Sequence, residues 1–545
     1  MFRMTGGQAL VRCLVREGVE VIFGLPGVQI YGAVAAIRDT PGIRMISPRS
    51  EAATTFMADG YARAGGRCGV ALVVPGPGVY NAAGGLSTAY AVSSPVLLIA
   101  GQIPRDKIGG NTGALHEVND QIATIMPVTK WQTRVLAPGD VPGAVREAFH
   151  RLRRGRPRPV YMEIPPEALL ELDEIELPAP APAERTAPPD ELIEEASKIL
   201  ASAENPLVLA GRGILCADAH IELQALAETY NLPVITSRGG KGALPDDHPL
   251  LYGAAYRRTG RLGEVFSGTD VLLAVGTRLA MGAPSPDSRV IRIDVDPNET
   301  GRLHANTLAL RGDAGATLAK LHDALAKTDA AGRSSPKNLI RATRERLNSS
   351  EERSEQHDRF MNAIRKALPE EGLVIMGMTQ LSYYSRSYWP VYQNRTFFDS
   401  GYSGNLGFAY PTALGAKVAR PDRPVVCIIG DGGFGYHSTE MSTAVKYGIN
   451  TVTVLFNDRA FGNVARDMDE NFGGSYEAEL NNPDYMKLAE AYGVEGIRVE
   501  DHSRLSDAVG RGIAADRPVL IEVPVETMPR PPHRSSRPAW AMPQE

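Results

Sequence analysis

Short apolar runs alternate along the chain with longer stretches in which apolar residues recur every three or four positions. The runs EVIFGL, GVALVV and PVLLIAG lie at 20–25, 69–74 and 95–101, and helical stretches of ten or more residues alternate with such runs. Continuous apolar strands joined by helices are typical of parallel sheets covered on both faces. The pattern therefore predicts an α/β fold of doubly wound parallel sheets.

Composition changes twice along the chain. The segment 176–191 is rich in Pro and Ala and the segment 326–338 is polar, as linkers usually are. The tail is rich in proline and lacks periodicity, so it is either a disordered end or a flap. We expect three domains followed by this tail, with the bounds 1–175, 190–325, 350–528 and 529–545.

Two of the expected domains close with nearly the same phrase. RPVYMEIPPE stands at 158–167 and RPVLIEVPVE at 517–526, each after a helical stretch. The repetition indicates two related domains that flank a different middle one. The alternative is that the phrase is simply a buried strand entered through a proline.

Charge and cysteine content narrow the class of partner. With 58 basic and 63 acidic residues, the chain has no overall field typical of nucleic-acid or membrane binding, so we expect small molecules and copies of itself as partners. No run has the length and apolarity of a signal peptide or a membrane span. The four cysteines are far apart and form no CxxC pair, which indicates a reducing cytoplasm rather than a disulfide framework or a zinc site.

The most informative segment is 424–463, which has the pattern strand, glycine turn, helix, strand. The turn GDGGFG at 430–435 satisfies the dinucleotide fingerprint GxGxxG, and Asp458 ends the next strand where a ribose-binding acid would lie. One hypothesis is therefore a nicotinamide-dependent oxidoreductase. Another is that GDGGFG forms only a tight strand–helix turn.

Asp431 argues against a simple dinucleotide site. Among the glycines its carboxylate would face a bound diphosphate and repel it unless a cation stood between them. Asp431 and Asp458 come at the carboxyl ends of adjacent parallel strands, where two carboxylates can hold magnesium while the glycine turn offers backbone N–H groups. The pattern predicts a metal-anchored diphosphate site.

This segment resembles the thiamine-diphosphate enzymes similar to acetolactate synthase, benzoylformate decarboxylase and oxalyl-CoA decarboxylase, whose motif begins with GDG and ends in a paired Asn. Here the pair is Asn457-Asp458, and the following hydrophobic-Gly step places Asp458 rather than Asn457 at the metal. Aspartate keeps the ligand oxygen and adds a charge that magnesium accepts. The resemblance implies Mg²⁺ bound by Asp431, Asp458 and the backbone carbonyl of Ala460, and cofactor contacts from Gly432, Gly433, Phe461 and Gly462.

The same resemblance extends over 46–102, which is similar to the family's pyrimidine-binding domain. Thiamine chemistry needs a carbanion at C2 of the thiazolium ring, and a carboxyl group bonded to the pyrimidine promotes it by favouring the imino tautomer. Glu51 falls on the family's activating glutamate. From position alone, Glu51 would be an early-helix residue that complements the helix dipole.

A third stretch, SGYSGNLGFAYPTALGAK at 400–417, resembles the loop that supports the bent cofactor. Leu406 falls on the apolar wedge, Gly404 on a carbonyl that binds the pyrimidine amino group, and Gln380 on a diphosphate contact. The alternative for Leu406 is an ordinary core leucine. Because Glu51 and GDG lie in different domains, the resemblance implies active sites between subunits of a homodimer or homotetramer.

Substrate contacts are less well defined. Ser50 and Pro75 stand where the family often has His and Ser, and His116 stands where acetolactate-synthase-like enzymes have Gln facing the substrate, followed by Glu117. His116 is a candidate catalytic proton relay, although a lone His in a polar loop is more often solvated or structural. Weaker candidates are His437, Asn463 and Arg466.

The middle segment resembles the family's central domain, in which some relatives carry FAD or a nucleotide. The phrase that accompanies FAD in acetolactate synthases is missing from LLYGAAYRRTGRLG at 250–263, so we predict that FAD is absent.

The predicted activity is thiamine-diphosphate-dependent decarboxylation of a 2-keto acid, carboligation, or both. A related alternative is a lyase that cleaves a 2-hydroxyacyl-CoA or oxalyl-CoA thioester. A non-catalytic relative is a further alternative, which Glu51 and the complete metal motif count against.

Overall fold

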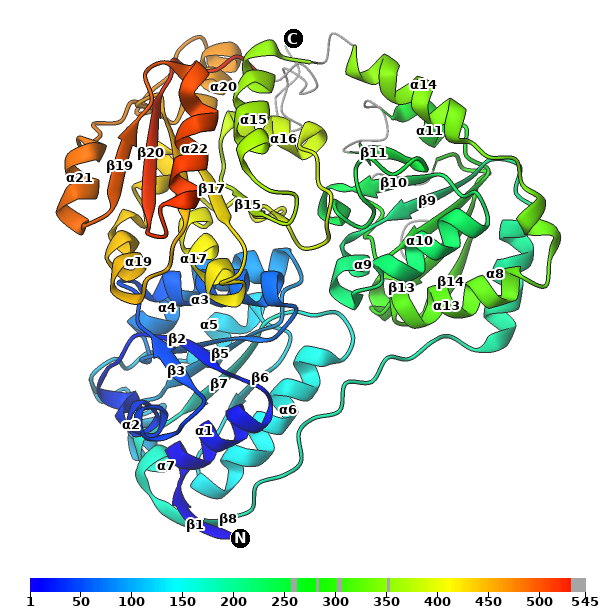
Figure 1. Ribbon diagram of the computed structural model, residues 1–545. Helices are drawn as coiled ribbons and strands as arrows, with labels where there is room; N and C mark the ends of the chain where they lie inside the picture. Colours follow the sequence, from blue (N-terminus) through cyan, green and yellow to red (C-terminus); the bar gives the residue numbers. More distant parts are fainter. Residues whose placement is uncertain (256–261, 281–283, 301–305, 350–352, 531–545) are drawn as a thin grey trace.

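The computed structural model describes residues 1–255, 262–280, 284–300, 306–349 and 353–530. These residues form three α/β units, each built on a parallel sheet of six strands with helices on its faces (Figure 1). The predicted class, doubly wound parallel sheets, is confirmed. No helix among the described residues is long and apolar enough to cross a membrane.

The first unit has the strand order β3-β2-β4-β5-β7-β6, and an antiparallel pair, β1 with β8, joins its ends. A capping box of Thr5 and Gln8 starts its first helix. Its strands are β1 (Phe2–Thr5), β2 (Val21–Gly24), β3 (Arg44–Ile46), β4 (Gly69–Val73), β5 (Val96–Gly101), β6 (Gln132–Arg134), β7 (Val160–Ile164) and β8 (Leu172–Ile175). Its helices are α1 (Gly6–Arg16), α2 (Tyr31–Asp39), α3 (Glu51–Gly65), α4 (Pro77–Ala91), α5 (Gln121–Ile125), α6 (Val141–Arg153) and α7 (Pro166–Leu170).

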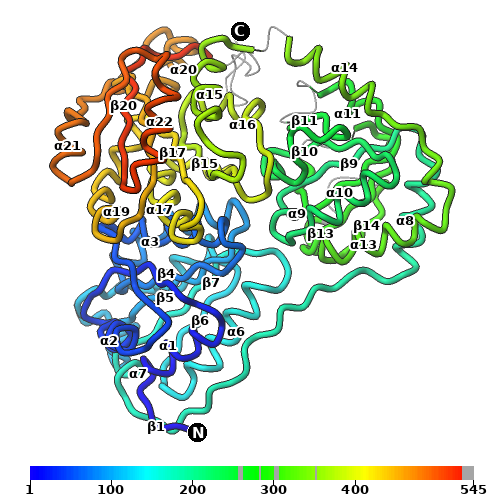
Figure 2. The backbone as a smooth tube through the Cα atoms, in the orientation of Figure 1, coloured from blue at the N-terminus to red at the C-terminus, as the bar shows by residue number. Residues whose placement is uncertain are grey.

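The central unit has the order β11-β10-β9-β12-β13-β14 and a hydrophobic core of its own. Figure 2 shows that the segment from β8 to α8 runs along the outside of the molecule to reach it. Its strands are β9 (Pro206–Ala210), β10 (Val234–Ser237), β11 (Leu251–Ala255), β12 (Val271–Val275), β13 (Arg289–Asp294) and β14 (Thr307–Arg311). Its helices are α8 (Asp190–Ala201), α9 (Arg212–Ala217), α10 (His220–Thr229), α11 (Gly263–Ser267), α12 (Pro297–Thr300), α13 (Ala314–Leu325) and α14 (Lys337–Asn348).

The third unit has the order β16-β15-β17-β18-β20-β19. Its strands are β15 (Leu373–Met376), β16 (Phe397–Phe398), β17 (Val425–Gly430), β18 (Val452–Asn457), β19 (Glu495–Arg498) and β20 (Val519–Pro524). Its helices are α15 (Glu355–Ala367), α16 (Gln380–Tyr388), α17 (Ala409–Ala419), α18 (Asp431–Phe434), α19 (Met441–Tyr447), α20 (Gly462–Phe472), α21 (Tyr485–Tyr492) and α22 (Leu505–Ala514).

The first and third sheets have the same topology. Numbered within each sheet, both follow the order 2-1-3-4-6-5, whereas the central sheet follows 3-2-1-4-5-6. The two RPV phrases form β7 and β20, which occupy equivalent places in their sheets. The repeated phrase therefore corresponds to two units of the same topology around a different central one.

The first and third units pack against each other through α3 and α17 and share one buried core. The helices approach closely because glycines stand at the contact. A Cβ on Gly60 would lie 2.0 Å from the carbonyl oxygen of Thr412, and one on Gly415 would lie 2.0 Å from that of Met57. No side chain fits there without moving the backbone.

Gly415→Ala should therefore destabilise the protein, by about 1–3 kcal/mol if the added methyl forces the helices apart. The matched control is Gly143→Ala in α6, where a Cβ would meet nothing within 4 Å, so helix propensity should keep or slightly raise stability. Urea unfolding followed by circular dichroism compares the midpoints. Equal midpoints for both variants would contradict the close-packing account.

Candidate functional site

Four neighbouring strands of the third sheet carry the residues predicted to bind cofactor and metal. Gln380 follows β15, Leu406 follows β16, Asp431 follows β17 and Asp458 follows β18. The strands are parallel and adjacent in the order β16-β15-β17-β18, so all four residues come at the same edge of the sheet. Ligands bind at this carboxyl edge in open α/β sheets.

Asp431 and Asp458 form an interacting pair of acids, the first buried and the second half-buried. Asp431 is only 3% exposed. Burial raises the pKa of Asp431, and burial together with the charge of Asp431 raises the pKa of Asp458 to about 6. Two like charges in a poorly solvated place favour proton uptake, and a bound cation would relieve the same repulsion.

Asn482 and Glu522 support this pair. Asn482 Nδ2 donates to Asp431 Oδ2 at 2.6 Å and to Asn457 Oδ1 at 3.0 Å, and Asn457 Nδ2 donates to Glu522 Oε1 at 2.8 Å. The side chain of Asn457 is thus held within the protein. Of the two neighbours Asn457 and Asp458, it is therefore Asp458 that interacts with Asp431.

The turn after β18 is held in an uncommon conformation. Arg459 has φ 58°, and the backbone on either side of Ala460 pairs with residues 478 and 480. Neither of those two hydrogen bonds uses the carbonyl of Ala460. A Cβ on Gly462 would lie 2.2 Å from Asp458 Oδ2, so glycine leaves the room that this carboxylate occupies.

The loop before α17 is attached to the first unit. Asn405 Nδ2 donates to the carbonyl oxygen of Gly84 at 2.8 Å, and also contacts hydroxyl groups of α4. Gly404 and Gly407 have φ 66° and 79°, which glycine adopts without strain. Leu406 between them is half-buried and lies outside the buried cores of the described chain, which argues against an ordinary core leucine.

The weaker substrate candidates all have partners inside the protein. Gln380 Nε2 donates to Asn463 Oδ1 at 3.0 Å, and Arg466 donates to Asn463 Oδ1 and to the carbonyl of Met528, both at 2.8 Å. Arg466 therefore ties the segment after β20 to α20 and is not a solvated side chain.

His437 lies in the contact between the first and third units. Its Nδ1 is 3.1 Å from the Gly407 carbonyl, its ring packs edge-on against Phe56, and burial lowers its pKa. These contacts describe a structural histidine.

The first sheet carries the other predicted site residues in loops at its carboxyl edge. Glu51 comes after β3, Gly76 after β4 and His116 after β5. Glu51 is the first residue of α3, half-buried, and accepts a hydrogen bond from Asn81 Nδ2 at 3.1 Å. Ser50 is the helix N-cap, its Oγ accepting from the amide of Ala52 at 3.2 Å, so the residue that replaces the family's His has a capping role.

The loop between β3 and Glu51 is fixed by the third unit of the same chain. The backbone N–H of Arg49 donates to both carboxylate oxygens of Glu440 at 3.0 Å, and Glu440 is fully buried. The Glu51 side chain has its hydrogen bond within its own unit. Within one chain the described contacts therefore hold Glu51 in place without joining it to the acid pair.

The glutamates of the repeated phrase have matching roles. Glu522 in β20 accepts from Asn457, and Glu163 in β7 accepts from Gln121 Nε2 at 3.0 Å, while Gln121 Oε1 accepts from the amide of Gly76 at 2.7 Å. Both are buried in otherwise apolar strands. Each starts a hydrogen-bond chain that ends at a site loop.

Sequence reasoning missed most of these supporting residues. Asn81 stands among small and apolar residues and Asn482 directly follows another asparagine, and neither belongs to a recognisable motif. The one available signal was a charged residue inside an apolar strand, because a buried carboxylate needs hydrogen-bond partners. This signal would have identified Glu163 and Glu522.

A large cavity of about 1050 Å³ lies where the three units meet, at the carboxyl edge of the central sheet. Arginines of all three units line it, among them Arg63, Arg212 and Arg395. The stretch on which the FAD prediction rests, 250–263, includes residues 256–261, which lie outside the described residues.

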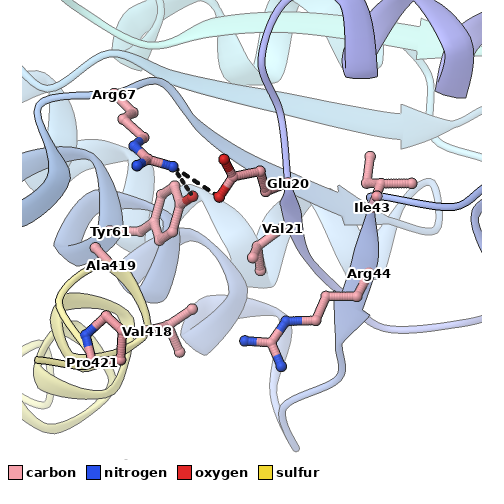
Figure 3. A pocket seen from close by; sticks show the side chains of 10 residues that line it. Glu20, Val21, Ile43, Arg44, Tyr61, Arg67, Val418, Ala419 and Pro421 are labelled. Atoms are coloured by element: carbon pink, nitrogen blue, oxygen red, sulfur yellow. Dashed lines mark hydrogen bonds and ion pairs between the residues drawn. The ribbon is translucent and has the colours of Figure 1, made fainter.

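A second cavity, about 620 Å³, lies between the first unit and the end of α17 (Figure 3). Arg67 spans it and donates to Glu20 at 2.8 Å and to the hydroxyl of Tyr61 at 3.5 Å. None of the predicted site residues lines it.

The chain matches known proteins along most of its length. Residues 4–124 match the N-terminal TPP binding domain of thiamine pyrophosphate enzymes, residues 193–321 their central domain, and residues 377–523 their C-terminal TPP binding domain. The two TPP binding domains are the units that carry Glu51 and the acid pair.

Three relatives match over nearly their whole length. The chain is 31% identical to a probable acetolactate synthase large subunit of Methanocaldococcus jannaschii, over 97% of this chain and 94% of the relative. It is 34% identical to a probable 2-ketoarginine decarboxylase of Pseudomonas aeruginosa, over 95% and 94%. It is 31% identical to the acetolactate synthase isozyme 3 large subunit of Escherichia coli, over 96% of each.

The fold and the acid pair define a three-unit α/β enzyme with a site at its sheet edges. The chain belongs to the thiamine pyrophosphate enzyme family, similar to acetolactate synthase. The prediction of a thiamine-diphosphate-dependent decarboxylase or carboligase is confirmed at this level, and the match favours it over a nicotinamide-dependent oxidoreductase.

Proposed function

We propose that the chain is a Mg²⁺- and thiamine-diphosphate-dependent enzyme that releases carbon dioxide from a 2-keto acid and then protonates the remaining fragment or joins it to a second carbonyl compound. The interacting pair Asp431–Asp458 at the edge of the third sheet carries the proposal. The names of the relatives, which include acetolactate synthases and a 2-ketoarginine decarboxylase, support the substrate class. No observation in the site favours a CoA thioester.

Magnesium fits the donors that are present. The described residues contain no group of three or more His, Cys, Asp or Glu side chains that could hold a metal ion. Asp431, Asp458 and the carbonyl of Ala460 would supply three oxygens, and the hard Mg²⁺ ion commonly completes its shell with substrate or cofactor phosphates and water. The diphosphate would approach Gly432 and Gly433, where no side chain stands in its way.

Glu51 and Leu406 would prepare the cofactor. Bound thiamine diphosphate supplies a carbon nucleophile for the keto carbon and accepts the electron pair left when carbon dioxide departs. Glu51 would hold a proton at the pyrimidine ring, and Leu406 would offer an apolar contact to the cofactor. Because Glu51 and the acid pair lie on different units, we propose a homodimer or homotetramer with sites between subunits.

His116 is the proposed proton relay at the substrate. It lies on the same sheet edge as Glu51 and has φ 70°, a strained value for a residue with a side chain. A proton donor at this place suits a reaction that ends by protonating carbon. The adjacent Glu117 stabilises the loop by accepting hydrogen bonds from the backbone amides of Thr112 and Ala114.

Two further proposals concern the absence of FAD and the cellular compartment of the enzyme. The purified protein should carry no FAD and should be colourless, so a bound yellow flavin would overturn that proposal. The four separate free cysteines support a reducing cytoplasm.

Asp458 offers a matched pair of variants for the metal. Asp458→Asn keeps a ligand oxygen and should bind thiamine diphosphate with Mg²⁺ within about tenfold of the wild type, whereas Asp458→Ala should lose about 100-fold or more. Calorimetric titration of each variant with thiamine diphosphate in the presence of Mg²⁺ measures the two affinities. Equal affinities would place the metal elsewhere.

Glu51→Gln should leave the fold and the cofactor site intact and lower turnover by at least about 100-fold, as expected when a proton-transfer group is lost. Release of carbon dioxide from 2-keto acids measures turnover. Glu20→Gln, which changes an exposed glutamate of the same unit, is the control. Near-normal turnover in Glu51→Gln would contradict the assignment.

A panel of 2-keto acids, supplied with and without an aldehyde or a second keto acid, tests the reaction itself. We expect cofactor-dependent carbon dioxide release from at least one acid, and the products distinguish protonation from ligation. Release that is absent throughout, together with cleavage of a 2-hydroxyacyl-CoA or oxalyl-CoA thioester, would contradict the proposed substrate class.

A further inference from the structure

Gln29 lies beneath the His116 loop and contacts it through both ends of its amide. Gln29 Nε2 donates to the carbonyl oxygen of Leu115 at 3.0 Å, and Gln29 Oε1 is 3.1 Å from His116 Nδ1. The Gln29 residue is 4% exposed, so water does not compete for these bonds. Neither contact was foreseen, because the two segments are far apart in the sequence.

The first contact determines the second. The carbonyl oxygen of Leu115 can only accept, so the amide nitrogen of Gln29 must face it. The oxygen of Gln29 then faces His116 Nδ1, and an acceptor bonds this ring nitrogen only if it carries hydrogen. In the neutral ring the hydrogen therefore resides on Nδ1 and the free lone pair on Nε2.

The backbone around His116 holds the ring in this position. A Cβ on Gly76 would lie 2.4 Å from the carbonyl oxygen of His116, so the loop rests directly on the turn after β4. Gly76 is itself fixed by Gln121. The strained φ of His116 is thus maintained by contacts on both sides.

We propose that Gln29 is a positioning residue that fixes the tautomer of His116, so that His116 exchanges a proton with the substrate through Nε2. This inference rests on the proposed proton relay. In a decarboxylation that ends in an aldehyde, the charged ring gives the Nε2 proton to the carbon that has lost carbon dioxide. The neutral ring then recovers a proton from water, and Nδ1 keeps its hydrogen throughout.

Two variants separate positioning from loop support. Gln29→Glu keeps an acceptor for Nδ1 but cannot donate to Leu115, whereas Gln29→Met removes both bonds. Nitrogen-15 NMR of histidine-labelled protein, with His116 assigned by its loss in His116→Ala, measures the tautomer. We expect hydrogen on Nδ1 in the wild type and in Gln29→Glu, and a shift toward the Nε2-protonated form in Gln29→Met. A wild-type ring protonated at Nε2 would overturn the inference.

Kinetics supply an independent test. Gln29→Met should lower kcat about tenfold with little change in KM, and the loss should disappear when His116 is already alanine, because the two residues act as one unit. A loss of the same size in the His116→Ala background means that Gln29 only supports the loop and contradicts the inference. If His116→Ala alone changes neither rate nor products, the relay itself is wrong, while the NMR result still decides the tautomer.

Discussion

Two neighbouring carboxylates, one buried and one half-buried, at the ends of adjacent parallel strands impose the constraint on which the site depends. Burial raises the pKa of both carboxyl groups, and the charge of Asp431 raises the pKa of Asp458 further, so a proton or a cation beside the pair would relieve the cost of burying two negative charges. The surrounding structure keeps the pair together. Asn482 bonds Asp431, Gly462 leaves room for Asp458, and Arg459 holds the turn after β18 in a left-handed conformation.

The first and third sheets have the same strand order but carry different predicted site residues. The third sheet presents the acid pair at its carboxyl edge, and the first sheet, with the same strand order, presents Glu51 and His116 at its own. Glycines at the α3–α17 contact allow the two units to approach closely. Glu440 fixes the backbone before Glu51. The central sheet has a different order and borders a basic cavity.

Much of this could be predicted from the sequence because the relevant signals are local. Apolar runs predicted the sheets, and glycines beside Asp431 predicted a diphosphate turn. Residues whose roles depend on tertiary contacts were not predictable. Asn482 meets Asp431 only after the chain folds back across the strand ends, and three strands separate Gln29 from His116 in the sequence. The repeated Glu of the RPV phrases was visible, but its role depended on where β7 and β20 lie.

The most direct measurement is a calorimetric titration of the cofactor-stripped wild-type protein with thiamine diphosphate, with and without Mg²⁺. The account predicts saturable binding that requires Mg²⁺, because only a cation between the acid pair and the diphosphate removes their repulsion. Binding of equal strength without any divalent metal, or no binding at all, would contradict the role assigned to Asp431 and Asp458.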